Sequence, residues 1–163
     1  MSSKKVLKAL NQQINAELFA AYQYMAMSAY LSGINFPGMA MWMRHQSQEE
    51  VEHAMKIFDY VHQIGSKVEF GSIDKPDQEY GDPYATFLTG LEHEQKVTAM
   101  INSLYELASE EKDYPTQLML QWFIDEQVEE EANFSQLVEQ FKMAGDNVTA
   151  LLALDAQLAS REA

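Results

Sequence analysis

Apolar residues recur every three or four positions along four long stretches of the chain, which is the period of an amphipathic α-helix. Cap and turn residues separate these stretches: serines precede the first, prolines open the next three, and glycines follow the second and the fourth. We expect Gly145 to close the fourth helix in a left-handed conformation. A shorter apolar stretch comes last. The pattern predicts five helices, at about residues 3–33, 37–64, 83–112, 115–144 and 148–160.

The connections between these stretches predict how the helices are arranged. Short joints link the first helix to the second and the third to the fourth, so each pair should form an antiparallel hairpin. Residues 66–82 have no helical period and form a connection that is long for a bundle. That length suits a crossover that runs along the bundle and joins two parallel helices. We therefore expect one all-α domain over residues 1–163: a four-helix bundle at about 3–144 with one long crossover between helices two and three, then a short C-terminal helix.

Polar residues interrupt each apolar stripe near its middle. The interrupting residues are Glu17 in the first stretch, Glu50 and His53 in the second, Glu94 in the third, and Gln127 and Glu130 in the fourth. A carboxylate buried alone is costly, so four that converge in one core need a compensating cation. Two divalent ions would balance four carboxylates, with the imidazole and the amide as neutral ligands. The pattern predicts a site for two metal ions inside the bundle.

An internal repeat relates the two predicted hairpins. The same offset of 77 residues separates three pairs of these polar residues: Glu17 and Glu94, Glu50 and Gln127, and His53 and Glu130. Glu50 and His53 form a Glu-x-x-His motif, which is known from di-metal carboxylate bundles, whereas the second half has Gln-x-x-Glu. For any one residue, a solvated position wrongly assigned to the core is the stronger interpretation. The shared register of all six favours the metal site.

Composition narrows the chemistry. The chain has no cysteine, which excludes disulfides, thiolate metal sites and a cysteine nucleophile. The formal net charge of −14 disfavours nucleic acid as a partner and attracts cations, although solubility alone can account for it. No apolar run is long enough to span a membrane, so we expect no membrane partner. The polar beginning of the chain is unlike a signal peptide, and a cytoplasmic location is expected.

At this point the sequence resembles the non-haem bacterial ferritins. The residues that carry the resemblance match the ferroxidase centre of that family: Glu17, Tyr24, Glu50-x-x-His53, Glu94 and Gln127-x-x-Glu130. The similarity covers nearly the whole chain, including the short fifth helix. It implies the ferritin-like fold, a hollow homo-oligomeric shell of 24 subunits, and storage of iron as a ferric mineral. The implied activity is that of a ferroxidase, which oxidises Fe(II) with dioxygen or hydrogen peroxide at a di-iron centre within each subunit.

The resemblance also assigns roles to individual residues. It implies that Glu17, Glu50 and His53 hold the first iron, with Glu50 bridging, and that Glu94, Gln127 and Glu130 complete the second. Glu49, Glu126 and Glu129 match a third iron site on the side that faces the cavity, and a solvated acidic face is an equally good interpretation of them. Tyr24 matches a tyrosine that can supply an electron to the iron pair. A core tyrosine with a satisfied hydroxyl is the alternative at this position.

Several expectations separate this chain from related proteins. Haem bacterioferritins have a second Glu-x-x-His and a methionine directly after the second-helix glutamate, where this chain has Glu130 and Val51, so no haem is expected. The histidines outside the polar stripe, His45, His62 and His93, are expected to be solvated. The alternative function is a di-iron oxidase or peroxidase that acts on another substrate. Such an enzyme needs an apolar substrate pocket, and a dimer rather than a shell would favour it.

Overall fold

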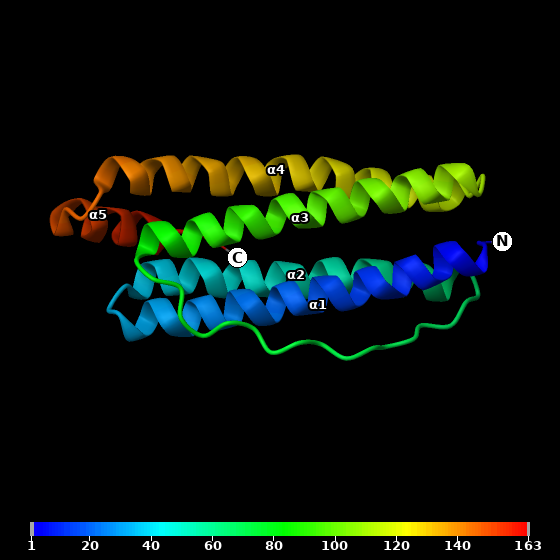
Figure 1. The fold of residues 1–163 in the computed structure, drawn as a ribbon, viewed down its shortest axis with the longest axis horizontal. Coiled ribbons are helices and arrows are strands. Elements are labelled where there is room, and N and C mark those ends of the chain that lie inside the picture. Colours follow the sequence, from blue (N-terminus) through cyan, green and yellow to red (C-terminus); the bar gives the residue numbers. More distant parts are fainter. Residues whose placement is uncertain (1, 163) are drawn as a thin grey trace.

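The computed structural model describes residues 2–162, and within them it contains helices and no strand. Four long helices lie side by side, and a short fifth helix folds across one end of the bundle (Figure 1). This confirms the expected all-α, ferritin-like architecture. None of the helices in the described residues is both long and apolar enough to cross a membrane. The helices are α1 Lys4–Gly33, α2 Pro37–Gln63, α3 Pro83–Glu110, α4 Tyr114–Ala144 and α5 Val148–Leu158.

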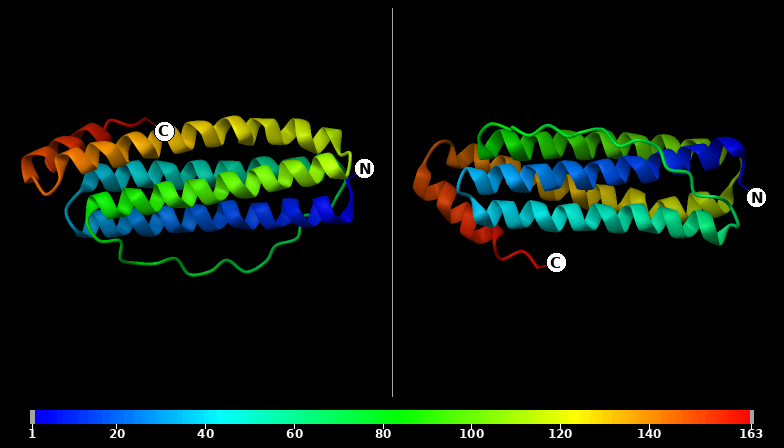
Figure 2. Two further views of the ribbon diagram at one scale, coloured as in Figure 1. Left: turned by 45° about the horizontal axis from the view of Figure 1, so that its top comes forward. Right: turned by 90° about the horizontal axis from the view of Figure 1, so that it is seen from below.

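The predicted long crossover is present between α2 and α3. It runs along the outside of the bundle, past α1, so that α2 and α3 point in the same direction (Figures 1 and 2). Asn11 of α1 holds part of this segment, because its side-chain oxygen accepts a hydrogen bond from the backbone of Glu69 at 3.0 Å. The crossover therefore lets each half of the chain form its own hairpin, α1 with α2 and α3 with α4.

Side chains cap the beginnings of four of the five helices by accepting a hydrogen bond from the first helical turn. These capping residues are Ser3, Asp82, Asp113 and Asn147. α2 differs, because its N-cap Phe36 makes no side-chain bond of this kind. The backbone amide of Met39 instead donates to the carboxylate of Asp155 in α5 at 2.8 Å. A residue far along the chain thus caps α2 and ties α5 to the bundle.

The apolar core is divided into two clusters by a polar layer. The cluster nearest α5 is rich in aromatic residues, including Tyr24, Phe87 and Phe134. The cluster at the opposite end is mostly aliphatic and includes Leu10 and Ile57. The four glutamates of the interrupted stripes lie between the two clusters, so apolar packing on both sides fixes the layer that contains them.

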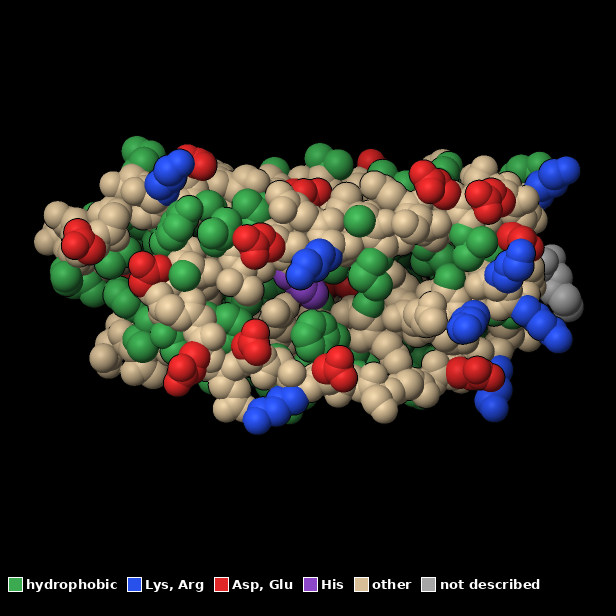
Figure 3. Space-filling model, viewed as in Figure 1, with side chains coloured by type: hydrophobic (Ala, Val, Ile, Leu, Met, Phe, Trp, Pro, Cys, Tyr) green, Lys and Arg blue, Asp and Glu red, His purple; other side chains and the backbone are tan. Residues whose placement is uncertain are grey.

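The ends of the elements refine the sequence-based expectations. Gly145 has a positive φ of 56°, but its ψ of −131° lies outside the left-handed helical region that we expected. A residue with a Cβ would be strained in that conformation. The other helix ends agree with the predicted ones to within the usual variation of a residue or two. Figure 3 shows basic side chains gathered at the end of the bundle where the chain begins, with acidic ones spread along the visible face.

Candidate metal centre

All four long helices contribute side chains to the polar layer. α1 provides Glu17, α2 provides Glu50 and His53, α3 provides Glu94, and α4 provides Gln127 and Glu130. Each of these six residues is at most 4% exposed. The structure thus brings together all six residues that the interrupted stripes singled out, in the middle of the bundle.

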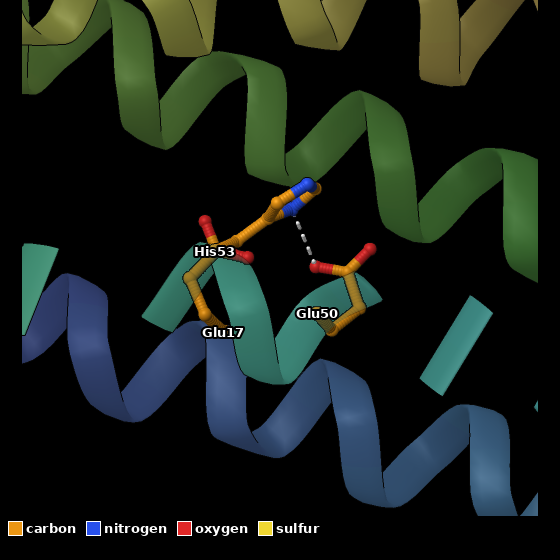
Figure 4. Close-up of side chains that lie close together, drawn as sticks. All are labelled: Glu17, Glu50 and His53. Carbon is orange, nitrogen blue, oxygen red and sulfur yellow. Dashed lines mark hydrogen bonds and ion pairs between the residues drawn. The ribbon is translucent and has the colours of Figure 1, made fainter. Parts of the chain in front are cut away.

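The carboxylates form two overlapping groups. Glu17, Glu50 and His53 each offer a ligand atom within 4.8 Å of the others, and Figure 4 shows these side chains extending from α1 and α2. Glu50, Glu94 and Glu130 form a second group with the same spacing. Glu50 belongs to both groups, so its carboxylate lies between two positions at which a metal ion could be held.

Hydrogen bonds hold the carboxylates of the second group. The hydroxyl of Tyr24 donates to Glu94 Oε1 at 2.5 Å. The amide nitrogen of Gln127 donates to the other oxygen of Glu94 at 3.1 Å and to its backbone carbonyl at 3.2 Å. Since the nitrogen of Gln127 is engaged in this way, its amide oxygen is the atom available as a ligand. The hydrogen bond that the buried Tyr24 hydroxyl requires is therefore made to a carboxylate of the site.

Two glutamines that were not among the predicted site residues contact the carboxylates directly. Gln46 Nε2 donates to Glu130 Oε2 at 2.6 Å and to Glu50 Oε1 at 3.3 Å. Gln13 Nε2 donates to Glu17 Oε1 at 3.1 Å. Each glutamine lies four residues before a glutamate of its own helix, and that spacing is the sequence signal that could have identified both.

The electrostatics of the layer favour a bound cation. Burial, followed by the charge of neighbouring Glu94, raises the pKa of Glu130 to about 9. Burial likewise raises the pKa of Glu94 to about 7, although hydrogen bonds from Tyr24 and Gln127 oppose it. Burial and the charges of Glu94 and Glu17 raise the pKa of Glu50 well above its usual range. Without a metal ion, protons bound to these carboxyl groups reduce the repulsion between them.

The donor set fits a divalent iron ion. No lysine or arginine within residues 2–162 forms an ion pair with any of the four glutamates. Glu17 Oε2 is buried without a hydrogen-bond partner. Carboxylate, amide and imidazole ligands together suit a borderline ion such as Fe(II). The charge of these residues and their ligand atoms therefore fit a site for a cation.

The three residues of the expected third iron site border this centre. Glu126 Oε1 is 3.7 Å from His53 Nε2, and Glu126, His53 and Glu130 form a further group with ligand spacing. Glu49 is half-buried and its carboxylate pairs with Arg161 at 3.1 Å. Glu129 is exposed. The structure thus brings one of the three residues to the centre and leaves the other two at its rim.

The expectation that the remaining histidines are solvated is confirmed for His62 only, because His45 and His93 are both half-buried. The ring of His93 packs edge-on against Tyr24, with 5.8 Å between the ring centroids, and burial lowers its pKa to about 4. His93 precedes Glu94, and it turns toward α1 beside the polar stripe.

Comparison with known proteins places the whole chain in one family. A family model described as a ferritin-like domain matches residues 7–144. The bacterial non-heme ferritin of Staphylococcus haemolyticus is 42% identical, with 99% of this chain and 97% of the relative aligned. That of Staphylococcus aureus (strain MRSA252) is 40% identical with the same coverage.

Solved structures agree with this assignment. An open pore ferritin from the hyperthermophilic archaeon Archaeoglobus fulgidus superposes with a TM-score of 0.98 at 44% identity, over 99% of this chain and 100% of that chain. A humanized archaeal ferritin gives a TM-score of 0.98 at 45% identity, over 99% and 98% of the two chains. With the fold and nearly the whole length in agreement, the chain belongs to the ferritin family and resembles its non-haem bacterial members.

Proposed function

We propose that this protein stores iron and that its polar layer is a ferroxidase centre, which oxidises two Fe(II) ions before they are deposited as ferric mineral. The observation that carries the proposal is the set of four buried glutamates without a cationic partner, arranged in two groups that share Glu50. Two divalent ions would supply the missing positive charge. Iron is the substrate of this site rather than a permanent component.

Each group of residues has its own role in the proposal. Glu17, Glu50 and His53 hold the first Fe(II), and Glu94, Gln127 and Glu130 hold the second, with the carboxylate of Glu50 between them. Each group has two carboxylates, and the third ligand is an imidazole in the first group but a weaker neutral amide in the second. We expect the second ion to bind more weakly, which suits a position that must also release its product.

Oxidation follows from the chemistry of the ligands. Each Fe(II) gives up one electron, and the two electrons with two protons reduce dioxygen to hydrogen peroxide. Carboxylates stabilise Fe(III) more than Fe(II), because the added charge strengthens their attraction, and this lowers the cost of oxidation. Tyr24 donates its hydrogen bond to Glu94, so it orients a ligand of the second ion and lies close enough to supply an electron.

The products leave through the side of the centre that is nearest the surface. A hollow of about 500 Å³ is lined by His53, Glu49, Glu126 and Trp122. His53 is buried against this hollow and Glu126 is partly exposed in it. Glu126 therefore provides an oxygen ligand between the centre and the surface. In this proposal Glu49 and Glu129 extend that path as a third iron site, and Fe(III) is hydrolysed beyond it.

Storage requires a closed particle, and we propose a shell of 24 identical subunits. The outer surface of the α1–α2 hairpin exposes large apolar residues, including Tyr22 and Met25, beside a groove of about 640 Å³ lined by Met25, Met41 and Arg44. Apolar surface of this kind commonly marks an interface between proteins. Light scattering should give a particle about 24 times the 18.6 kDa chain, whereas a dimer would favour an oxidase that acts on another substrate.

The direct test of the proposed activity is the initial rate of Fe(II) oxidation by dioxygen, followed by absorbance. Glu50→Ala removes a ligand of both ions, so the rate should fall by at least about 100-fold, the upper range for loss of an outer-shell contact. Glu106→Ala, an exposed glutamate on α3, is the matched control and should keep the wild-type rate. Equal rates in wild type and Glu50→Ala would refute the ferroxidase proposal.

A further inference from the structure

The segment after α5 carries an arginine whose contacts lead to the metal centre. The guanidinium of Arg161 lies over the ring of Trp42, 4.3 Å from its centroid, and donates to the Trp42 backbone carbonyl at 3.1 Å. Its Nη2 also donates to Gln46 Oε1 at 3.1 Å and pairs with Glu49 at 3.1 Å. All of these partners belong to α2. The side chain is 17% exposed, so most of it is withdrawn from water.

Two contacts at the beginning of α2 fix the position of this segment. The carboxylate of Asp155 in α5 accepts a hydrogen bond from the Met39 amide, which supplies the cap that α2 lacks. Gly38 allows α5 to approach closely, because a Cβ at this position would lie 1.9 Å from the Asp155 carbonyl oxygen. The chain then turns back along α2 (Figure 2), where Arg161 makes its contacts. Arg161 is therefore held against α2 rather than free at the surface.

The orientation of the Gln46 amide depends on this arginine. A primary amide has an oxygen that accepts and a nitrogen that donates, and the two ends have nearly the same shape. Arg161 can only donate, so it selects the orientation in which Gln46 Oε1 faces the guanidinium. The nitrogen then faces the metal centre and donates to Glu130 and Glu50. The opposite orientation would set N–H groups against a cation and an oxygen against two carboxylates.

We propose that Arg161 is a positioning residue for the metal centre, and that it acts through Gln46 to hold Glu130 in the geometry that binds the second metal ion. The proposal rests on the function proposed above. Gln46 engages one oxygen of Glu130 and leaves the other for the metal. Without Arg161, only the two carboxylates favour this orientation of the amide, and Gln46 holds Glu130 less firmly. The C-terminal segment thereby contributes to the affinity of a site buried inside the bundle.

The test uses Co(II) as the probe and measures binding to the assembled apoprotein by visible absorption, with no turnover required. Wild type should bind two Co(II) ions per subunit at the centre. Arg161→Met should keep this stoichiometry but lower the affinity for the second ion by about tenfold. That is the usual loss when an outer-shell contact to a ligand is removed. Lys8→Met removes an exposed cation of α1 and should leave both affinities unchanged. Arg161→Lys keeps the charge without the planar fork and should restore only part of the affinity.

A double-mutant cycle separates positioning from simple anchoring of the segment. If Arg161 acts through Gln46, then Gln46→Leu with Arg161→Met should be no worse than Gln46→Leu alone. Losses that add would show that the two residues act independently and would overturn the proposal. So would a lower melting temperature in Arg161→Met with unchanged Co(II) affinity, because that result means a structural anchor only. Should Arg161→Met not assemble, the same cycle run with Arg161→Lys decides the matter.

Co(II) binding by the wild type distinguishes the ferroxidase function from the positioning role of Arg161. If wild type binds no Co(II) at the centre, the ferroxidase assignment itself fails. If wild type binds two ions and the second affinity is the same in Arg161→Met, the ferroxidase assignment stands and the positioning role is refuted.

Discussion

The two hairpins of the bundle present the same register of polar residues with different chemistry. The α1–α2 hairpin contributes Glu17 with Glu50 and His53, while the α3–α4 hairpin contributes Glu94 with Gln127 and Glu130. The imidazole of the first half corresponds to a carboxylate in the second, and the carboxylate of Glu50 corresponds to an amide. Both halves keep two carboxylates. The repeat therefore fixes where ligands are placed, and the substitutions within it determine how tightly each half holds a metal ion.

The two halves also differ in how their carboxylates are supported. Glu94 accepts hydrogen bonds from Tyr24 and Gln127, and Glu130 accepts one from Gln46. Glu17 accepts one bond from Gln13, and its other oxygen has no partner. An unpartnered buried oxygen gains most from a metal ion, whereas a carboxylate held by several donors is already compensated. Glu17 of the first half therefore depends on the metal more than Glu94 of the second half does.

Removal of the His53 imidazole should have the largest effect on the difference between the two halves. His53→Ala takes away the one ligand type that the second half does not have, so we expect the tight site to be lost. The measured stoichiometry of anaerobic Fe(II) binding should fall by about one ion per subunit, and the oxidation rate by about 100-fold or more. His62→Ala, which changes an exposed histidine of the same helix, is the matched control. Full stoichiometry in His53→Ala would show that the first site does not use this histidine.

Gln127→Glu should make the two halves more alike. The added carboxylate gives the second site another charged ligand, and we expect its Co(II) affinity to rise by about tenfold, or about 1.4 kcal/mol. Release of Fe(III) should slow, so the rate over many turnovers should fall below that of the first turnover. A second-site affinity that is unchanged or weaker would contradict this expectation and would mean that the lost hydrogen bonds to Glu94 outweigh the added charge.

Tyr24→Phe should have a smaller effect. It removes the hydrogen bond to Glu94 and leaves the aromatic packing of Tyr24 against Phe134 in place. A hydrogen bond to a charged group contributes about 1.5–3 kcal/mol, and metal binding recovers part of that loss, so the second site should weaken by no more than about tenfold. Stopped-flow oxidation and Co(II) titration measure the two effects separately. A slower rate with unchanged affinity would instead favour electron transfer from the tyrosine.

The pH dependence of the apoprotein should show the smallest effect, and it tests the raised pKa values of the buried glutamates. Burial raises the pKa of Glu130 to about 9 and that of Glu94 to about 7. A carboxyl whose pKa is raised by folding stabilises the protein below its unfolded pKa and loses that contribution as pH rises through the folded pKa. The melting temperature of apoprotein should therefore fall between about pH 5 and pH 9.

The matched variant for this measurement is Glu130→Gln, which cannot titrate at that position. Its melting temperature should fall less over the same pH range, by a few degrees. Addition of Co(II) should reduce the pH dependence of wild type, since the metal replaces the protons. Identical pH profiles for the two apoproteins would contradict the raised pKa of Glu130.

Much of the centre could be predicted because the helical period determines which residues share a face. Glu17, Glu50 and Glu94 interrupt apolar stripes, and burial of those stripes brings the interruptions together. The long connection between two hairpins likewise predicted the crossover. These features depend on spacing along the chain, which a sequence displays directly.

The features that were missed depend on how separate elements approach one another. Arg161 reaches Gln46 only because α5 folds back over the beginning of α2, and no periodicity encodes that contact. His93 is half-buried because its ring packs against Tyr24 of another helix. The ψ angle of Gly145 belongs to the turn between α4 and α5, which no helical period describes. Such details follow from tertiary packing.

Anaerobic calorimetric titration of the apoprotein with Fe(II) is the decisive measurement for a metal centre in the polar layer. We expect two Fe(II) ions to bind per subunit with unequal affinities. The tighter one should disappear in His53→Ala, and the weaker one should be strengthened in Gln127→Glu. Wild-type protein that binds no Fe(II) tightly, or binds it with the same profile after Glu17, Glu50 and His53 are all replaced by alanine, would contradict the assignment of this polar layer as a metal centre.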